Sequence, residues 1–290
     1  MASLAQWIEG ARPRTLPAAV APVLVGTAAA HALGSADLGY AVLALCVALG
    51  FQVGVNYAND YSDGIRGTDE ERVGPVRLVG QRLAEPANVR TAAFAAFFGA
   101  GLAGFALVAL SGAWLLLALG LACLWAAWHY TGGDNPYGYR GWGEVMVFVF
   151  FGLVAVLGTT WTQAQTLDLG ALGGALGCGF LASAILVTNN LRDLEGDRAA
   201  GKRTLAVRMG FRRTRRLYLG LVVGAFLAVG LAAIAHPWAL LGLLAAPLAW
   251  RPTRLVTSDA YGPALLPALV QTGLLQLGYA VALALGLALS

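Results

Sequence analysis

Long apolar runs, separated by short polar or charged segments, repeat along the whole chain. Runs such as residues 38–55, 91–111 and 170–188 reach the roughly 18–20 residues that a helix needs to cross a bilayer. Lipid offers no partners to backbone N–H and C=O groups, so this pattern favours membrane-spanning helices. Together with the turn signals between the runs, it predicts nine such helices, at residues 15–33, 38–60, 90–110, 113–131, 142–163, 169–190, 214–235, 238–255 and 264–288.

The composition points to the same class of protein. Of the 290 residues, 58% are hydrophobic and 12% are charged, whereas an average soluble domain has roughly 25% charged residues. We therefore expect one all-α, polytopic membrane domain over residues 1–290, and no nucleic-acid partner. Cys46, Cys123 and Cys178 lie in separate apolar runs, without the spacing of a disulfide framework or a zinc site.

The positive charges predict how the chain is oriented. With nine helices, every Lys and Arg falls at the N-terminus or in alternate connections, which place all of them on one side of the membrane. The connections on the other side, near residues 34–35, 111–112, 163–168 and 236–237, carry none. By the positive-inside rule, the N-terminus and the charged loops are cytoplasmic and the C-terminus lies outside the cell membrane.

Two groups of polar residues lie at the cytoplasmic ends of predicted helices. In the first group Asn56, Asp60 and Asp63 are spaced i, i+4 and i+7, which places them on one face if the helix continues. The second group has nearly the same spacing, i, i+4 and i+8, and consists of Asn189, Asp193 and Asp197. Solvated helix ends would explain one such group, but two on the same membrane face favour a shared ligand.

Magnesium fits these groups, because it prefers oxygen ligands and is commonly held by one or two carboxylates together with substrate phosphates. Basic residues follow each group closely: Arg66, Arg72 and Arg77 after the first, and Lys202 and Arg203 after the second. Cations there would neutralise phosphate oxygens. The pattern predicts a magnesium-dependent site that ionises an allylic diphosphate, with an apolar cavity for the isoprenoid tail.

Four segments resemble the UbiA superfamily of membrane prenyltransferases, and within it the MenA branch, the 1,4-dihydroxy-2-naphthoate polyprenyltransferases. Residues 11–17 read ARPRTLP, and residues 56–64 read NYANDYSDG and continue to RVGPVR at 72–77. The third segment has YTGG at 130–133 and PYGYRG at 136–141, and the fourth runs from NNLRD at 189–193 to KRTL at 202–205. The matching segments are spread over most of the chain.

The resemblance implies helices around a central cavity, with both aspartate motifs beneath a cytoplasmic cap. It also implies transfer of a polyprenyl chain from its diphosphate to 1,4-dihydroxy-2-naphthoate, with loss of the ring carboxylate, which gives demethylmenaquinone. The expected catalytic residues are Asp60, Asp63, Asp193 and Asp197, and with Asn56 and Asn189 they form the expected magnesium ligands. The expected substrate-binding residues are Asn56, Asn59, Arg72, Arg77, Tyr139, Asn189, Arg192 and Lys202.

Other features leave alternatives open. The chain has Asp134-Asn135 after YTGG, where the family has a basic residue, so contacts of this loop with the acceptor are in question. Glu144 is either a base toward an acceptor hydroxyl or an acidic residue favoured at a helix N-terminus. The run from Asp69 to Glu71 either extends the first metal group or belongs to a solvated loop.

Two competing functions remain from the sequence. A membrane transporter also carries buried carboxylates, but transporters tend to place them near the bilayer midplane on broken helices. Within the enzyme class, the acceptor could be another aromatic acid, such as hydroxybenzoate or homogentisate.

Overall fold

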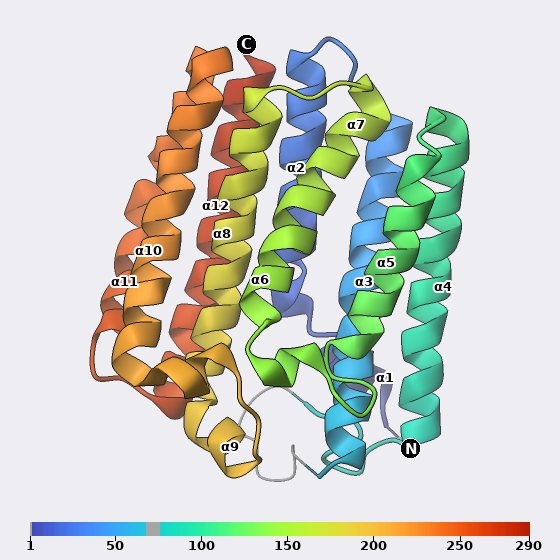
Figure 1. Cartoon of the computed structure of the whole chain (residues 1–290), viewed down its shortest axis with the longest axis vertical. Helices are drawn as coiled ribbons and strands as arrows, with labels where there is room; N and C mark the ends of the chain where they lie inside the picture. The colour runs from blue at the N-terminus through green and yellow to red at the C-terminus, as the bar shows by residue number, and fades with distance from the viewer. Residues whose placement is uncertain (1, 68–75) are drawn as a thin grey trace.

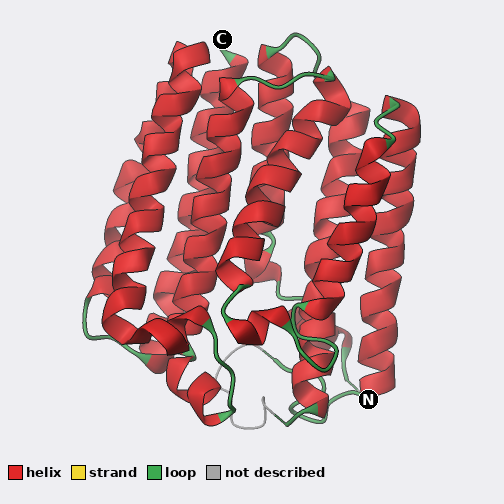
Figure 2. Ribbon diagram, in the orientation of Figure 1, coloured by secondary structure: helices red, strands yellow, loops and turns green. Residues whose placement is uncertain are grey.

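The chain forms a bundle of long helices in which spans that follow one another along the chain run in opposite directions (Figure 1). The computed structural model describes residues 2–67 and 76–290, and these contain helices, turns and loops but no β-strand (Figure 2). The all-α class predicted from the sequence is therefore confirmed. The helix α1 lies at one end of the bundle and the C-terminus at the other (Figure 1).

Each predicted helix coincides with a helical stretch of the structure, although several boundaries differ. The elements are α1 (Leu4–Gly10), η1 (Pro13–Thr15), α2 (Pro17–Ala32), α3 (Leu38–Ile65), α4 (Pro86–Ser111), α5 (Leu115–His129), η2 (Tyr137–Arg140), α6 (Gly143–Val147), η3 (Phe148–Leu157), α7 (Gly158–Ala164), α8 (Leu169–Arg192), α9 (Leu194–Ala199), α10 (Leu205–Ala235), η4 (Pro237–Ala245), α11 (Ala246–Thr257), η5 (Gly262–Leu265) and α12 (Leu266–Ala288).

The chain crosses the membrane several times. Among the described residues, six helical stretches are long and apolar enough to span a bilayer, and α1–η1 with α2 makes a seventh if this pair, bent by 49°, is counted as one span. Helix α5 has 15 residues, fewer than a regular span needs. The stretch Pro237–Thr257 changes from a 3-10 to an α-helix and carries prolines. Length and composition therefore do not confirm the predicted count of nine.

Apolar side chains cover the outside of the bundle. Large hydrophobic residues are exposed on α4, α5, α10, η4 and α12, and examples are Phe98, Leu115, Leu227, Leu244 and Leu285. In water such a surface would drive aggregation, whereas in a bilayer it faces lipid tails. The outward faces of these helices are thus those of a membrane protein.

Helix α8 lies inside the bundle, packed against η3, α10, α12 and α2. Its membrane-spanning window is 72% buried, compared with 28% for α4. Most residues of its first half are Gly, Ala, Ser or Cys, which lets neighbouring backbones approach closely. This central helix carries the second aspartate motif at its C-terminal end.

Candidate active site

All described Lys and Arg residues lie at or near the end of the bundle that holds α1, η2 and α9 (Figure 1). Helix α3 continues past the predicted residue 60 to Ile65, so Asn56, Asp60 and Asp63 share one continuous helix, as expected. These three side chains are buried, with 3%, 1% and 3% exposure. Three buried polar groups within two turns need partners or a ligand.

Asp60 binds the segment that follows the first motif. Its two carboxylate oxygens accept hydrogen bonds from the backbone N–H groups of Leu78 and Val79, at 2.6 and 3.2 Å. The adjacent Arg77, a predicted substrate-binding residue, is also buried at 5% exposure. Arg72 and the run from Asp69 to Glu71 lie outside the described residues. Asp60 thus holds the chain before α4 against the end of α3.

Asn56 is held by the N-terminal segment. Its amide Nδ2 donates to the carbonyl oxygen of Ala11 at 2.9 Å and to the Thr15 hydroxyl at 3.1 Å. Gln52, one turn away on α3, also donates to the Thr15 hydroxyl, from its Nε2 at 2.9 Å. These bonds fix the Asn56 amide so that its oxygen stays available as a ligand.

The turn that follows α5 is tied to the same end of α3. The Thr131 hydroxyl donates to the Asn59 side-chain oxygen at 2.7 Å, and the Arg66 guanidinium donates to the carbonyl oxygens of Thr131 and Gly133. Asn59, a predicted substrate-binding residue, is therefore bonded within the protein. Thr15 and Thr131 were not among the predicted site residues, although both lie in the segments that resemble the family.

Lys202 connects the two motifs. Its ammonium lies 3.2 Å from Asp63 Oδ1, and the two side chains are only 5% and 4% exposed. Its own backbone N–H donates to the carbonyl oxygen of Asp197 at 2.8 Å. The structure therefore brings the end of the first motif and the segment after the second into direct contact.

Tyr139 lies in the same contact region. Its hydroxyl donates to Asp63 Oδ1, and its ring lies beneath the Lys202 ammonium, 4.6 Å from the nitrogen. Its backbone carbonyl accepts a hydrogen bond from the Arg203 N–H at 2.9 Å. Thus Tyr139, predicted to bind substrate, joins the turn η2 to both motifs.

The second motif does not form a continuous helix, and the expected spacing on one helical face is wrong. Helix α8 ends at Arg192, Asp193 has φ −91° and ψ 3°, and Asp197 lies on the separate helix α9. The Arg192 guanidinium bonds both oxygens of Asp193, at 2.7 and 2.6 Å, and Asn189 Oδ1 at 2.8 Å. Neighbouring side chains on a regular helix point in different directions, so this pairing accompanies the break at Asp193.

The phenol of Tyr130 lies close to carboxylates of both motifs. Burial raises the pKa of Tyr130 well above its ordinary value, and the charges of Glu144, Asp63 and Asp197 raise it further, as does Tyr137. The hydroxyl therefore stays protonated at neutral pH.

The donor set fits magnesium that is shared with a substrate. Among the described residues, no group of three or more His, Cys, Asp and Glu side chains is close enough to hold a metal on its own. Magnesium does not need such a cage, because it keeps waters and binds substrate phosphates through one or two carboxylates. Asp63 and Asp197 are buried carboxylates, and the oxygen of Asn56 has no hydrogen-bond partner among the described residues. These residues offer the oxygen ligands that the ion prefers.

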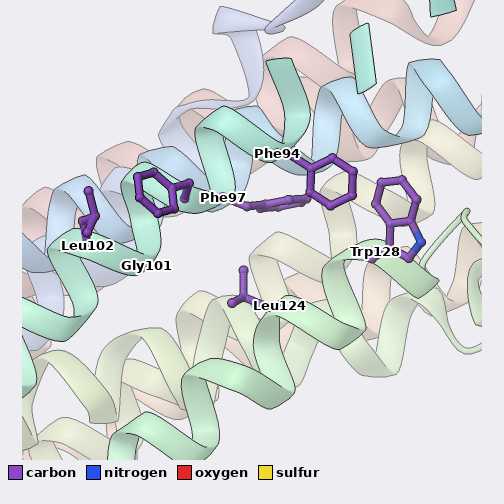
Figure 3. A pocket seen from close by; sticks show the side chains of 7 residues that line it. Phe94, Phe97, Gly101, Leu102, Leu124 and Trp128 are labelled. Atoms are coloured by element: carbon purple, nitrogen blue, oxygen red, sulfur yellow. The ribbon is translucent and has the colours of Figure 1, made fainter. Parts of the chain in front are cut away.

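A separate apolar groove of about 570 Å³ lies between α4 and α5 (Figure 3). Its lining includes Phe94, Phe98 and Leu102, which are 51%, 68% and 57% exposed. The groove holds no carboxylate and opens to the lipid-facing surface. The central cavity implied by the resemblance stays a prediction.

Comparisons with known proteins agree with this arrangement. Residues 19–264 match the UbiA prenyltransferase family. A protein of Mycobacterium tuberculosis named 1,4-dihydroxy-2-naphthoate octaprenyltransferase is 54% identical, over 99% of this chain and 98% of its own length. An Escherichia coli protein of the same name is 39% identical, over 92% of this chain and 89% of its own.

The fold is also found in solved structures. The structure of a UbiA homolog from Archaeoglobus fulgidus superposes with a TM-score of 0.67 at 15% identity, covering 98% of this chain and all of the other. Another structure of a UbiA homolog from that organism, bound to DMAPP and Mg²⁺, has a TM-score of 0.64 at 15% identity, covering 96% of this chain and 98% of the other. The match over most of its length, supported by these relatives, shows that this chain belongs to the UbiA prenyltransferase family.

Proposed function

We propose that this protein transfers a polyprenyl chain from its diphosphate to 1,4-dihydroxy-2-naphthoate in menaquinone biosynthesis. The observation that carries the proposal is the 54% identity, over 99% of the chain, to a relative named for this reaction. The contact between Lys202 and Asp63 supports it, because it joins the two motifs at one end of the bundle. The family assignment favours this enzyme over the membrane transporter considered from the sequence.

The residues of the two motifs would hold the diphosphate with magnesium. Magnesium, when bound, would neutralise the negative charge that the diphosphate gains as it leaves. The proposed ligands are Asn56, Asp60, Asp63, Asn189, Asp193 and Asp197. Lys202 would donate to a phosphate oxygen from its position beside Asp63, and Arg72, Arg77 and Arg192 are the further basic groups we assign to the diphosphate.

The reaction exchanges one bond of the isoprenoid for another. The C1–O bond breaks and the diphosphate keeps the electron pair, while a ring carbon of the naphthoate forms a new bond to C1. The ring then loses its carboxylate as carbon dioxide, which leaves its bonding pair in the ring. The product is the quinol form of demethylmenaquinone. The protein's part is to orient both substrates and to keep water from the developing cation.

We further propose that the site lies on the cytoplasmic side and that residues 1–290 form one domain. All described Lys and Arg residues lie near the end of the bundle that carries the motifs, and the positive-inside rule assigns that end to the cytoplasm. The single domain is supported by the structural match to 98% of the chain.

The proposal is tested with the purified protein in detergent. It is incubated with a polyprenyl diphosphate and either 1,4-dihydroxy-2-naphthoate or 4-hydroxybenzoate, with magnesium or with EDTA. We expect carbon dioxide and a prenylated naphthoquinol only with the naphthoate and only with magnesium. Turnover of hydroxybenzoate instead would overturn the acceptor, and undiminished turnover in EDTA would overturn the metal requirement.

A further inference from the structure

Glu144 is a buried carboxylate, and one of its two oxygens has no hydrogen-bond partner among the described residues. It lies in the first turn of α6 and is 6% exposed. Its Oε1 accepts a hydrogen bond from Asn190 Nδ2 at 2.9 Å, whereas Oε2 has no hydrogen-bond partner among the described residues. Leaving a buried polar atom without a partner is costly, and such atoms in native proteins call for an explanation. A bound ligand that donates a hydrogen bond would supply one.

Glu144 lies at the same end of the bundle as the two aspartate motifs. Its partner Asn190 lies in the last turn of α8, the helix that carries the start of the second motif. The Tyr130 hydroxyl lies 3.4 Å from the point where a Cβ on Gly143, the residue before Glu144, would stand. The charges of Glu144, Asp63 and Asp197 all act on the phenol of Tyr130. Glu144 is thus the acidic side chain on the α6 side of the candidate site.

The hydrogen-bonding properties of Glu144 Oε2 indicate which substrate group would bind to it. A carboxylate accepts hydrogen bonds and repels anions, so the diphosphate and the carboxylate of an aromatic acid are both poor partners. A ring hydroxyl is a donor and is a good partner. A hydroxyl that donates to a carboxylate also enriches the aromatic ring in electrons, which favours attack of the ring on an allylic carbon.

We propose that Glu144 Oε2 accepts a hydrogen bond from a hydroxyl group of the aromatic acceptor. Asn190 holds the other oxygen and so fixes the direction of the carboxylate. The acceptor then lies with that hydroxyl toward α6 and with its own carboxylate away from Glu144. This inference rests on the proposed function, and it makes Glu144 an acceptor-binding residue.

The variant Glu144→Gln tests the proposal because it keeps the side-chain shape and the bond to Asn190 but removes the charge. Hydrogen bonds to charged groups are the stronger ones, so we expect the KM and the Kd for 1,4-dihydroxy-2-naphthoate to rise about tenfold or more. The KM for the polyprenyl diphosphate should stay within about twofold. The control is Glu195→Gln, which makes the same charge change on a side chain that is 63% exposed, and it should alter neither KM.

Analogues of the acceptor give a second test that needs no variant. At least one of 1-hydroxy-2-naphthoate and 4-hydroxy-2-naphthoate, each lacking one hydroxyl, should bind the wild-type protein at least about tenfold more weakly than the dihydroxy compound, because one of them lacks the hydroxyl that donates to Glu144. Glu144→Gln should lose most of this discrimination. Equal affinity of the wild type for all three compounds, or an unchanged acceptor KM in Glu144→Gln, would overturn the inference. If the wild type neither binds nor prenylates the dihydroxy compound, the proposed function itself fails.

Discussion

At the scale of single residues, Asp63 and Lys202 illustrate how the protein keeps charges inside the site before a substrate arrives. Both side chains are almost fully buried, and they lie 3.2 Å apart. Burying a carboxylate without a counter-charge would be strongly unfavourable. The positive charge of Lys202 therefore balances the negative charge of Asp63 within the protein. From this position Lys202 would also bind the phosphate oxygens of the diphosphate.

Replacing Lys202 with Met tests this assignment. Met retains the length of the apolar stem but removes the charge, so we expect the KM for the polyprenyl diphosphate to rise about tenfold, with a smaller change in the acceptor KM. The measurement is steady-state prenylation with each substrate varied in turn. Arg198→Met is the control, because the Arg198 side chain is 53% exposed and pairs only with Glu195 among the described residues. An unchanged diphosphate KM in Lys202→Met would remove Lys202 from the site.

At the scale of helices, the close approach of η3 to α8 determines where the α6–η3–α7 span lies. The stretch Phe148–Leu157 is a π-helix, a form that often occurs at functional sites. Gly152 of this stretch faces the backbone of Gly179 and Ala175 on α8. Because α6 begins this span, the same contact sets the height of Glu144 relative to Asn190.

The packing predicts different effects on stability for two Gly→Ala substitutions in this span. A Cβ on Gly152 would lie 2.5 Å from the Gly179 Cα and 2.7 Å from the Ala175 oxygen, so the two helices would have to separate. We expect a loss of about 1–3 kcal/mol in stability. At Gly158 a Cβ meets nothing within 4 Å, and the better helix propensity of Ala should leave stability unchanged or slightly raised.

Thermal unfolding of both variants in the same detergent checks this pair. The unfolding midpoint should fall for Gly152→Ala and should not fall for Gly158→Ala. Equal midpoints for the two variants would show that the contact between η3 and α8 is not closely packed.

At the scale of the whole molecule, the distribution of charge predicts the orientation in the membrane. The described Lys and Arg residues gather at one end of the bundle, and the connection between α2 and α3 at the other end carries none of them. The site and helix α9 are thus expected in the cytoplasm.

Labelling of single cysteines tests this orientation. In a variant with Cys46, Cys123 and Cys178 replaced by Ser, either Ser35→Cys or Ala199→Cys is added; both positions are exposed, at opposite ends of the bundle. In right-side-out membrane vesicles, a membrane-impermeant maleimide should label position 35 directly and position 199 only after detergent is added. The reverse pattern would mean that the site faces outward.

Much of this architecture followed from the order of the residues. The apolar runs predicted helical stretches in the right places, because lipid requires each spanning segment to satisfy its own backbone hydrogen bonds. The spacing of Asn56, Asp60 and Asp63 placed them on one helical face, since α3 continues through all three. The resemblance of four segments identified the family before any contact was known.

The three-dimensional structure decided the relations that no local pattern encodes. The break between α8 and α9 accompanies the Arg192–Asp193 pairing, whereas the sequence spacing suggested an unbroken helix. The contacts of Lys202 with Asp63 and of Glu144 with Asn190 join residues 139 and 46 positions apart, and only the packing of distant helices brings them together. The sequence by itself therefore determined which chemical groups stand at the charged ends of the helices, because charge and hydropathy are local properties. Which of those groups meet was decided by the tertiary structure, because contact between helices depends on how their surfaces fit.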